Sequence, residues 1–85
     1  MFRLELTTQE NGDIQNALIL AAERYESNAV ELRKAEAEYK AAEEADPDAQ
    51  RIIHSSACVP MAESFEAMAE RTRALLDKII EAEEA

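Results

Sequence analysis

An unbroken heptad spacing constrains this chain more than any other feature of its sequence. Over residues 14–42 the apolar residues recur at alternating intervals of four and three, with a single polar member: Ile14, Leu18, Ala21, Tyr25, Asn28, Leu32, Ala35, Tyr39 and Ala42. This spacing places all of these side chains on one stripe of an α-helix. With Asp13 as a plausible N-cap, the stripe predicts a long helix over residues 13–45.

A second stripe with the same spacing follows closer to the C-terminus: Met61, Phe65, Met68, Thr72, Leu75, Ile79 and Ala82. Between the two stripes, Asp46-Pro47-Asp48 breaks the chain and can cap a new helix. We therefore predict a second helix over residues 47–84, kinked or interrupted near 59–60 because Pro60 would remove a hydrogen bond from its interior. The short connection predicts that the two helices fold back on each other as an antiparallel hairpin.

The N-terminal segment has a different pattern. Phe2, Leu4 and Leu6 alternate with Arg3 and Glu5, which favours a short β-strand over residues 2–7, and Asn11-Gly12 is a strong turn signal after it. The alternative is an irregular arm that packs its three large side chains. A lone strand must pair with a second copy, with a partner or with water. The predicted fold class is thus mainly all-α, in a single domain over residues 1–85.

Two helices of this length have more apolar residues than they can enclose between themselves. Ile19, Leu20, Val30, Leu76 and Ile80 lie off the two stripes, and burying each large one is worth roughly 1.5–3 kcal/mol. We therefore expect a homo-oligomer, with a dimer of two hairpins favoured, or one hairpin packed against a partner. The residues predicted to build the oligomer are Phe2, Leu4, Leu6, Ile19, Leu76 and Ile80.

The composition excludes several classes of protein. A single cysteine allows no internal disulfide, the chain start lacks the apolar core of a secretion signal, and no apolar run is long enough for a membrane span. These features predict a cytoplasmic protein that does not enter the membrane. Nineteen acidic residues against nine basic ones give a net charge of -10, which disfavours nucleic acid as a direct ligand and favours a basic partner.

No constellation of residues points to catalysis or to a cofactor. His54 and Cys58 lie one helical turn apart, but a metal site needs further ligands at matching spacing. A di-iron site would need glutamate three residues before His54, where the chain has Arg51. No glycine-rich loop is available to hold phosphate, and the basic residues are scattered. We therefore predict no enzyme, no metal and no cofactor. Tyr25 and Tyr39 are interpreted as core residues, with an interface hot spot as the alternative, and Asn28 is interpreted as a polar residue that sets the register of packing.

The acidic residues allow two interpretations. Most such runs only keep a small protein soluble. Alternatively, rows of carboxylates on a rigid rod imitate the phosphate backbone and occupy a basic groove that normally holds nucleic acid. For the second interpretation the candidate target-binding residues lie at the predicted hairpin tip: Glu36, Glu43, Glu44, Asp46 and Asp48.

Two segments, residues 1–8 (MFRLELTT) and 21–25 (AAERY), resemble small acidic accessory proteins encoded by phages. Some members of that group inhibit host defence systems, including CRISPR effectors. The resemblance implies an interaction role in the cytosol of a host cell and assigns no functional residue. The expected function is therefore a non-enzymatic, oligomeric inhibitor of a host protein. The alternative is a structural or assembly adaptor that binds a partner helix through exposed apolar helix faces.

Overall fold

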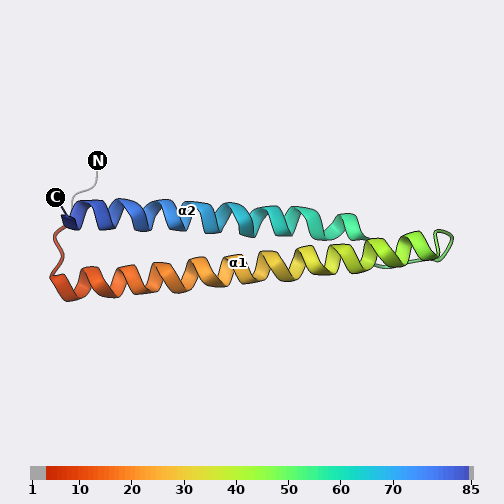
Figure 1. The fold of residues 1–85 in the computed structure, drawn as a ribbon, viewed down its shortest axis with the longest axis horizontal. Coiled ribbons are helices and arrows are strands. Elements are labelled where there is room, and N and C mark those ends of the chain that lie inside the picture. Colours follow the sequence, from red (N-terminus) through yellow and green to blue (C-terminus); the bar gives the residue numbers. More distant parts are fainter. Residues whose placement is uncertain (1–3, 85) are drawn as a thin grey trace.

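The computed structural model describes residues 4–84 and consists of two long helices in an antiparallel hairpin. Helix α1 spans Thr8–Ala45, a 3-10 turn η1 spans Ser55–Ala57, and helix α2 spans Cys58–Glu84 (Figure 1). The helices lie side by side along a rod with extents of 60 × 23 × 18 Å. The predicted mainly α-helical hairpin is confirmed.

Helix α1 begins earlier than the heptad stripe indicates. Thr7 is its N-cap: the Thr7 hydroxyl accepts a hydrogen bond from the Glu10 backbone N–H at 3.1 Å, and Glu10 Oε1 accepts one from the Thr7 backbone N–H at 2.9 Å. This reciprocal capping box satisfies two backbone donors that would otherwise lack partners. The predicted N-cap Asp13 and the predicted turn at Asn11-Gly12 are therefore wrong, because both lie inside the helix.

The predicted N-terminal strand is not present in the part of the chain that the structure describes. Residues 4–7 form no strand and lead into the capping box at Thr7, so Leu4 and Leu6 belong to an irregular arm. For residues 4–7 the structure is consistent with the alternative prediction, an irregular arm, and not with a strand. The predicted strand residues Phe2 and Arg3 lie outside the described residues.

Helix α1 ends at Ala45, where the sequence placed its end, but the second helix does not restart at Pro47. Residues 46–54 are an irregular connection, and α2 begins only at Cys58. The connection satisfies the end of α1, since the Ala42 carbonyl accepts hydrogen bonds from the Asp46 backbone N–H at 3.1 Å and from Arg51 Nη2 at 2.6 Å.

Pro60 is the third residue of α2, so it neither kinks nor interrupts the helix. The first four N–H groups of an α-helix have no carbonyl partner within it, and a proline there removes no hydrogen bond. The predicted defect near 59–60 is wrong, because it assumed that the helix was already established upstream. At 1.5 Å per residue, α1 is roughly 57 Å long and α2 roughly 40 Å. The final turns of α1 therefore extend past the start of α2 (Figure 1).

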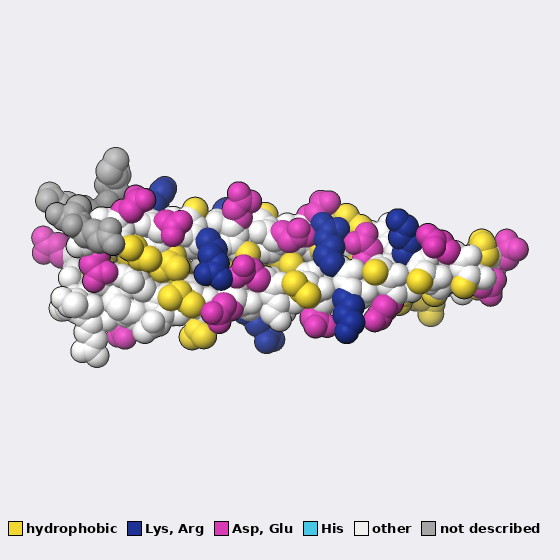
Figure 2. All heavy atoms as spheres, in the orientation of Figure 1, with side chains coloured by type: hydrophobic (Ala, Val, Ile, Leu, Met, Phe, Trp, Pro, Cys, Tyr) yellow, Lys and Arg dark blue, Asp and Glu magenta, His cyan; other side chains and the backbone are white. Residues whose placement is uncertain are grey.

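None of the described helices has a stretch both long and apolar enough to cross a bilayer. In the view of Figure 2, acidic side chains occur along the whole length of the rod, with basic and apolar side chains between them.

Candidate interaction surfaces

The two helices meet along a seam of small residues. The buried residues are Ala22, Ala29, Cys58, Ala62, Ala69 and Leu76. Four of the six are alanines at heptad intervals, and small side chains at such positions let two helix backbones approach closely. We call this set the alanine seam. It is rotated by one residue from the predicted stripes, whose members are half-buried or exposed.

An internal repeat underlies the alanine seam. Residues 22–33 (AERYESNAVELR) and 62–73 (AESFEAMAERTR) share Ala, Glu, an aromatic residue, Glu, Ala and Arg at the same six positions. In an antiparallel pair, such a repeat produces an approximate two-fold axis between the helices. The two helices make equivalent contacts in both directions: Glu26 of α1 pairs with Arg73 of α2, and Glu66 of α2 pairs with Arg33 of α1. Tyr25 stacks on Phe65 with ring centroids 6.2 Å apart. This repeat is the sequence signal that identifies the helix–helix contact.

The reciprocal ion pairs frame an open groove on one side of the rod. Its floor includes Ala29, Val30 and Ala69, and its walls are formed by Glu26, Arg33, Glu66, Glu70 and Arg73. The groove has a volume of about 610 Å³. Arg33 donates to Glu36 from Nη1 at 3.1 Å and to Glu66 from Nε at 2.9 Å, and these two contacts raise the pKa of its guanidinium. We call this side the ion-pair face.

A second hollow of the rod is mostly apolar. Ile14 of α1 lines it together with Leu75, Ile79 and Ala82 of α2 and with Leu4 and Leu6 of the N-terminal arm, and Asn11 and Glu83 complete the lining. The apolar α1 and α2 residues of this lining belong to the two predicted stripes, so both stripes emerge on the same side of the hairpin. We call the surface formed by the two stripes the apolar face. The heptad pattern therefore identified a half-buried side of each helix, from which Tyr25 and Phe65 reach into the helix contact, whereas the buried residues of that contact are those of the alanine seam.

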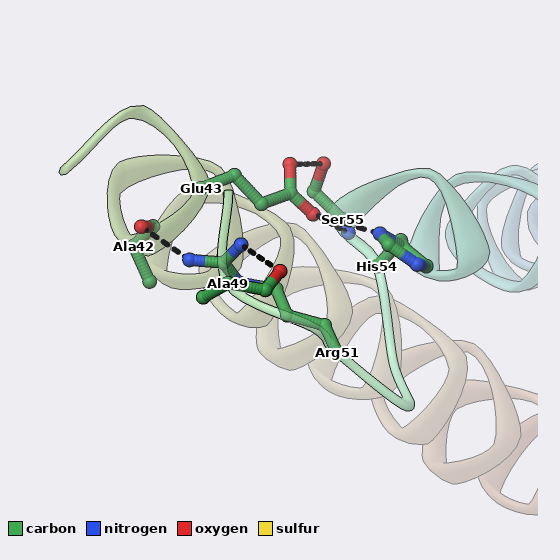
Figure 3. A network of polar contacts seen from close by, with 6 residues as sticks. All are labelled: Ala42, Glu43, Ala49, Arg51, His54 and Ser55. Atoms are coloured by element: carbon green, nitrogen blue, oxygen red, sulfur yellow. Dashed lines mark hydrogen bonds and ion pairs between the residues drawn. The ribbon is translucent and has the colours of Figure 1, made fainter. Parts of the chain in front are cut away.

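A polar network holds the hairpin tip (Figure 3). Glu43, near the end of α1, accepts hydrogen bonds from the Ser55 backbone N–H at 2.7 Å and from the Ser55 hydroxyl at 2.8 Å. It thereby satisfies a donor at the start of the 3-10 turn, while His54 Nδ1 lies 3.7 Å from Glu43 Oε1. The pKa of Glu43 is lowered, first by the two Ser55 donors and then by the positive charges of His54 and Arg51.

This network predicts acid sensitivity at the tip. Because the pKa of Glu43 is lower in the folded chain than its ordinary value of 4.5, its stabilising contribution is complete above that value. The contribution is lost as the pH falls through the lowered value. Between pH 7 and pH 3 the wild type should therefore lose more thermal stability than Glu43→Gln. Melting followed by circular dichroism measures this. The control Glu44→Gln, at an exposed neighbour, should follow the wild type, and identical pH profiles for wild type and Glu43→Gln would contradict the assignment.

The structure divides the five predicted target-binding acids into two groups. Glu43 is bound to Ser55, and Glu36 forms an ion pair with Arg33, so both carboxylates have partners within the chain. Glu44, Asp46 and Asp48 are exposed at the tip. They are joined there by Ile52 and Ile53 of the connection, which are 101% and 51% exposed. The tip is therefore both acidic and apolar, a combination that was not predicted from the sequence.

The residues predicted to build an oligomer are also divided. Leu4 and Leu6 are exposed, and Ile19 and Ile80 are half-buried. Leu76 was expected to face outward but is only 7% exposed, because the helix contact is rotated onto the alanine seam. It is consequently unavailable to a second copy. Phe2 lies outside the described residues.

The His54–Cys58 pair is not brought together as a site. Cys58 is buried in the alanine seam, whereas the side chain of His54 is 62% exposed beside Glu43. Across residues 4–84, no three of the His, Cys, Asp and Glu side chains are arranged so that they could hold a metal ion.

Comparisons with models of protein families, with curated proteins and with solved structures find no match to this chain. The interaction surfaces therefore have to be interpreted from their own geometry.

Proposed function

We propose that this chain is a non-enzymatic protein-binding protein that acts through exposed apolar surfaces, as an adaptor or assembly component. The observation that supports this proposal most directly is the pattern of burial. Apart from Leu76, the large apolar side chains that the structure describes remain partly or fully exposed, and most of the buried residues are alanines. Many large apolar side chains exposed on one folded protein are typical of surfaces that contact other proteins.

Leu20 and Val30 are two large apolar side chains of α1 that face solvent. They are 66% and 65% exposed, so the hairpin gains little from them. Val30 lies in the groove of the ion-pair face, where an apolar floor between charged walls suits the apolar ridge of a partner helix flanked by polar residues. A helix laid in such a groove would bury the floor and leave the ion pairs at the polar rim.

The acidic character supports a second candidate, an inhibitor that imitates nucleic acid and binds a basic groove. Nineteen acidic residues over a 60 Å rod correspond to one per roughly 3 Å, close to the spacing of about 3.4 Å per phosphate along one DNA strand. The net charge of -10, however, corresponds to one per roughly 6 Å, against about 1.7 Å in duplex DNA. This candidate includes the expectation of a phage-type inhibitor of a host defence protein. The exposed tip acids Glu44, Asp46 and Asp48 would carry it.

One capture experiment separates the two candidates. The tagged full chain is expressed in a bacterial host and its partners are recovered at about 50 mM and about 500 mM salt, since salt screens exposed charges and barely affects apolar contacts. Three variants are compared: Leu20→Gln with Val30→Gln, the tip variant with Glu44→Gln, Asp46→Asn and Asp48→Asn, and the matched control Ser27→Gln.

An adaptor should keep its partner at high salt and lose it only in the Leu20 and Val30 variant. An acidic inhibitor should lose its partner at high salt and in the tip variant. A capture profile that is the same for the wild type and all variants at both salt concentrations would contradict both forms of the proposal.

A further inference from the structure

The apolar face is the surface of this molecule whose burial against another protein would be most stabilising. Among its members, Leu18, Tyr25, Leu32, Phe65 and Met68 are half-buried, and Leu75 is 48% exposed. No large side chain in residues 4–84 is fully buried. The hairpin buries alanines, one cysteine and one leucine among the described residues, and it leaves part of each large stripe residue exposed, including Tyr25 and Phe65, which stack on each other at the helix contact.

The total solvent-accessible surface of the chain indicates how much area is available for burial against another protein. Its solvent-accessible surface is 6839 Å², whereas a compact monomer of 9.5 kDa has roughly 5,000 Å². The excess of roughly 1,800 Å² lies within the range of about 1,000–2,500 Å² that each chain buries in an obligate homodimer. An area of this size is thus available on the rod for contact with a second copy.

The charge distribution favours a second copy of this chain, over a different protein, as the occupant of the apolar face. Each chain carries a net charge of -10, so two copies repel each other wherever their charged surfaces meet. Neither stripe of the apolar face contains a charged residue. Two copies can thus meet along the stripes without placing a stripe carboxylate between them, while Glu83 borders the face at its hollow. Stripes without acids offer nothing specific to a basic partner.

We propose that the apolar face is the interface with a second copy of this chain, which completes a four-helix bundle. This inference rests on the proposed function, because it assigns an occupant to one of the protein-binding surfaces proposed there. The ion-pair face and the hairpin tip remain outside the bundle and are free for another protein. In this arrangement the alanine seam holds each hairpin together, and the two predicted stripes form the core between the hairpins.

Asn28 fixes the register of the two hairpins. It is the single polar residue of the α1 stripe and lies near the middle of the rod, beside Ala29 of the seam. The polar residue of the α2 stripe, Thr72, donates its hydroxyl to the Met68 carbonyl at 2.7 Å and so is satisfied within its own helix. An amide near the centre of a symmetric interface pairs with its own copy, and such a pair specifies alignment in coiled coils. The two-fold axis of the dimer therefore passes close to Asn28.

The test is the molar mass of the full chain across a dilution series, by light scattering and analytical ultracentrifugation. The wild type should have twice the 9.5 kDa of one chain at micromolar concentration. Leu75→Glu should raise the dissociation constant by at least about 100-fold, because a symmetric interface loses the buried leucine twice. The matched control Ala74→Glu adds the same charge at the neighbouring exposed position and should remain a dimer.

A second measurement distinguishes the loss of the dimer from misfolding of the variant. Leu75→Glu should keep the helix content of the wild type by circular dichroism, since Leu75 lies off the alanine seam. In a Cys58→Ala background, Asn28→Cys should form a disulfide-linked dimer upon oxidation, whereas Glu31→Cys, at an exposed position, should not. The second pair of variants tests the register as well as the surface.

Three results would overturn the proposal. They are a wild type that stays monomeric at high micromolar concentration, a dimer that Leu75→Glu and Ala74→Glu weaken equally, and a disulfide that forms at position 31 instead of 28. None of these results affects the capture experiment with Leu20 and Val30, so the failure of the dimer and the failure of the proposed function are distinguishable.

Discussion

Replacement of Leu76 by alanine is expected to lower the free energy of unfolding by about 2–5 kcal/mol. Among the buried side chains that the structure describes, Leu76 is the one large apolar residue, at 7% exposure. Removing its side chain deletes buried methyl groups and leaves a cavity between two helices that have few other large contacts to compensate. Because stability in so small a chain is marginal, this loss is a large fraction of the total.

The neighbouring residue Leu75 provides a matched control. It is the same amino acid in the same helix, but it is 48% exposed. Leu75→Ala should therefore cost clearly less than Leu76→Ala in urea unfolding followed by circular dichroism. The comparison belongs at the lowest workable protein concentration, where a second copy contributes least. The predicted stripes imply the opposite order, since they contain Leu75 and leave Leu76 outside. A larger cost for Leu75→Ala would thus restore that arrangement and contradict the alanine seam.

The helical hairpin itself could be predicted from the sequence because it depends on local signals. The 4-3 spacing of apolar residues, the near absence of glycine and the break at Asp46-Pro47-Asp48 define two helices joined by a short connection. The end of α1 at Ala45 follows from the same signals. All of these features act within a few residues of each other along the chain.

The rotation of the helix contact could not be read from hydrophobicity alone. A stripe of large apolar residues identifies a buried side of a helix, but two helices can meet along small residues beside it. Close packing of alanines brings the backbones near each other, while the larger residues are left for another layer. The repeat with Glu26 and Glu66 and with Arg33 and Arg73 contained this information, because reciprocal ion pairs form only in one antiparallel register.

The errors at the helix starts have a similar cause, since capping competes with weaker signals. Thr7 and Glu10 form a capping box, and its two hydrogen bonds carry the helix through Asn11 and Gly12 in spite of their turn propensity. At the other end, Glu43 reaches across the hairpin to the Ser55 backbone N–H. A partner twelve residues away is not visible in local patterns, so α2 was predicted to begin at Pro47.

Replacement of Ala22 by leucine should cost about 1–3 kcal/mol, because Ala22 is completely buried in the seam and has no space beside it for a larger side chain. The added isobutyl group must either adopt a strained rotamer or push α1 away from α2. Alanine and leucine have nearly the same helix propensity, so the helix itself is not weakened. Urea unfolding followed by circular dichroism measures the loss.

The matched control is Ala37→Leu, which makes the same change at an exposed position of the same helix. It should leave the free energy of unfolding within about 0.5 kcal/mol of the wild type. The two arrangements of the hairpin differ in the sign of the effect at position 22. If the helices met along the predicted stripes, Ala22 would lie at the edge of the contact, and a leucine there would add apolar area and stabilise the hairpin. A stabilising Ala22→Leu would therefore exclude close contact along the alanines. It would also remove the reason for assigning the apolar face to a second copy, because the large residues of the stripes would then be covered within one chain.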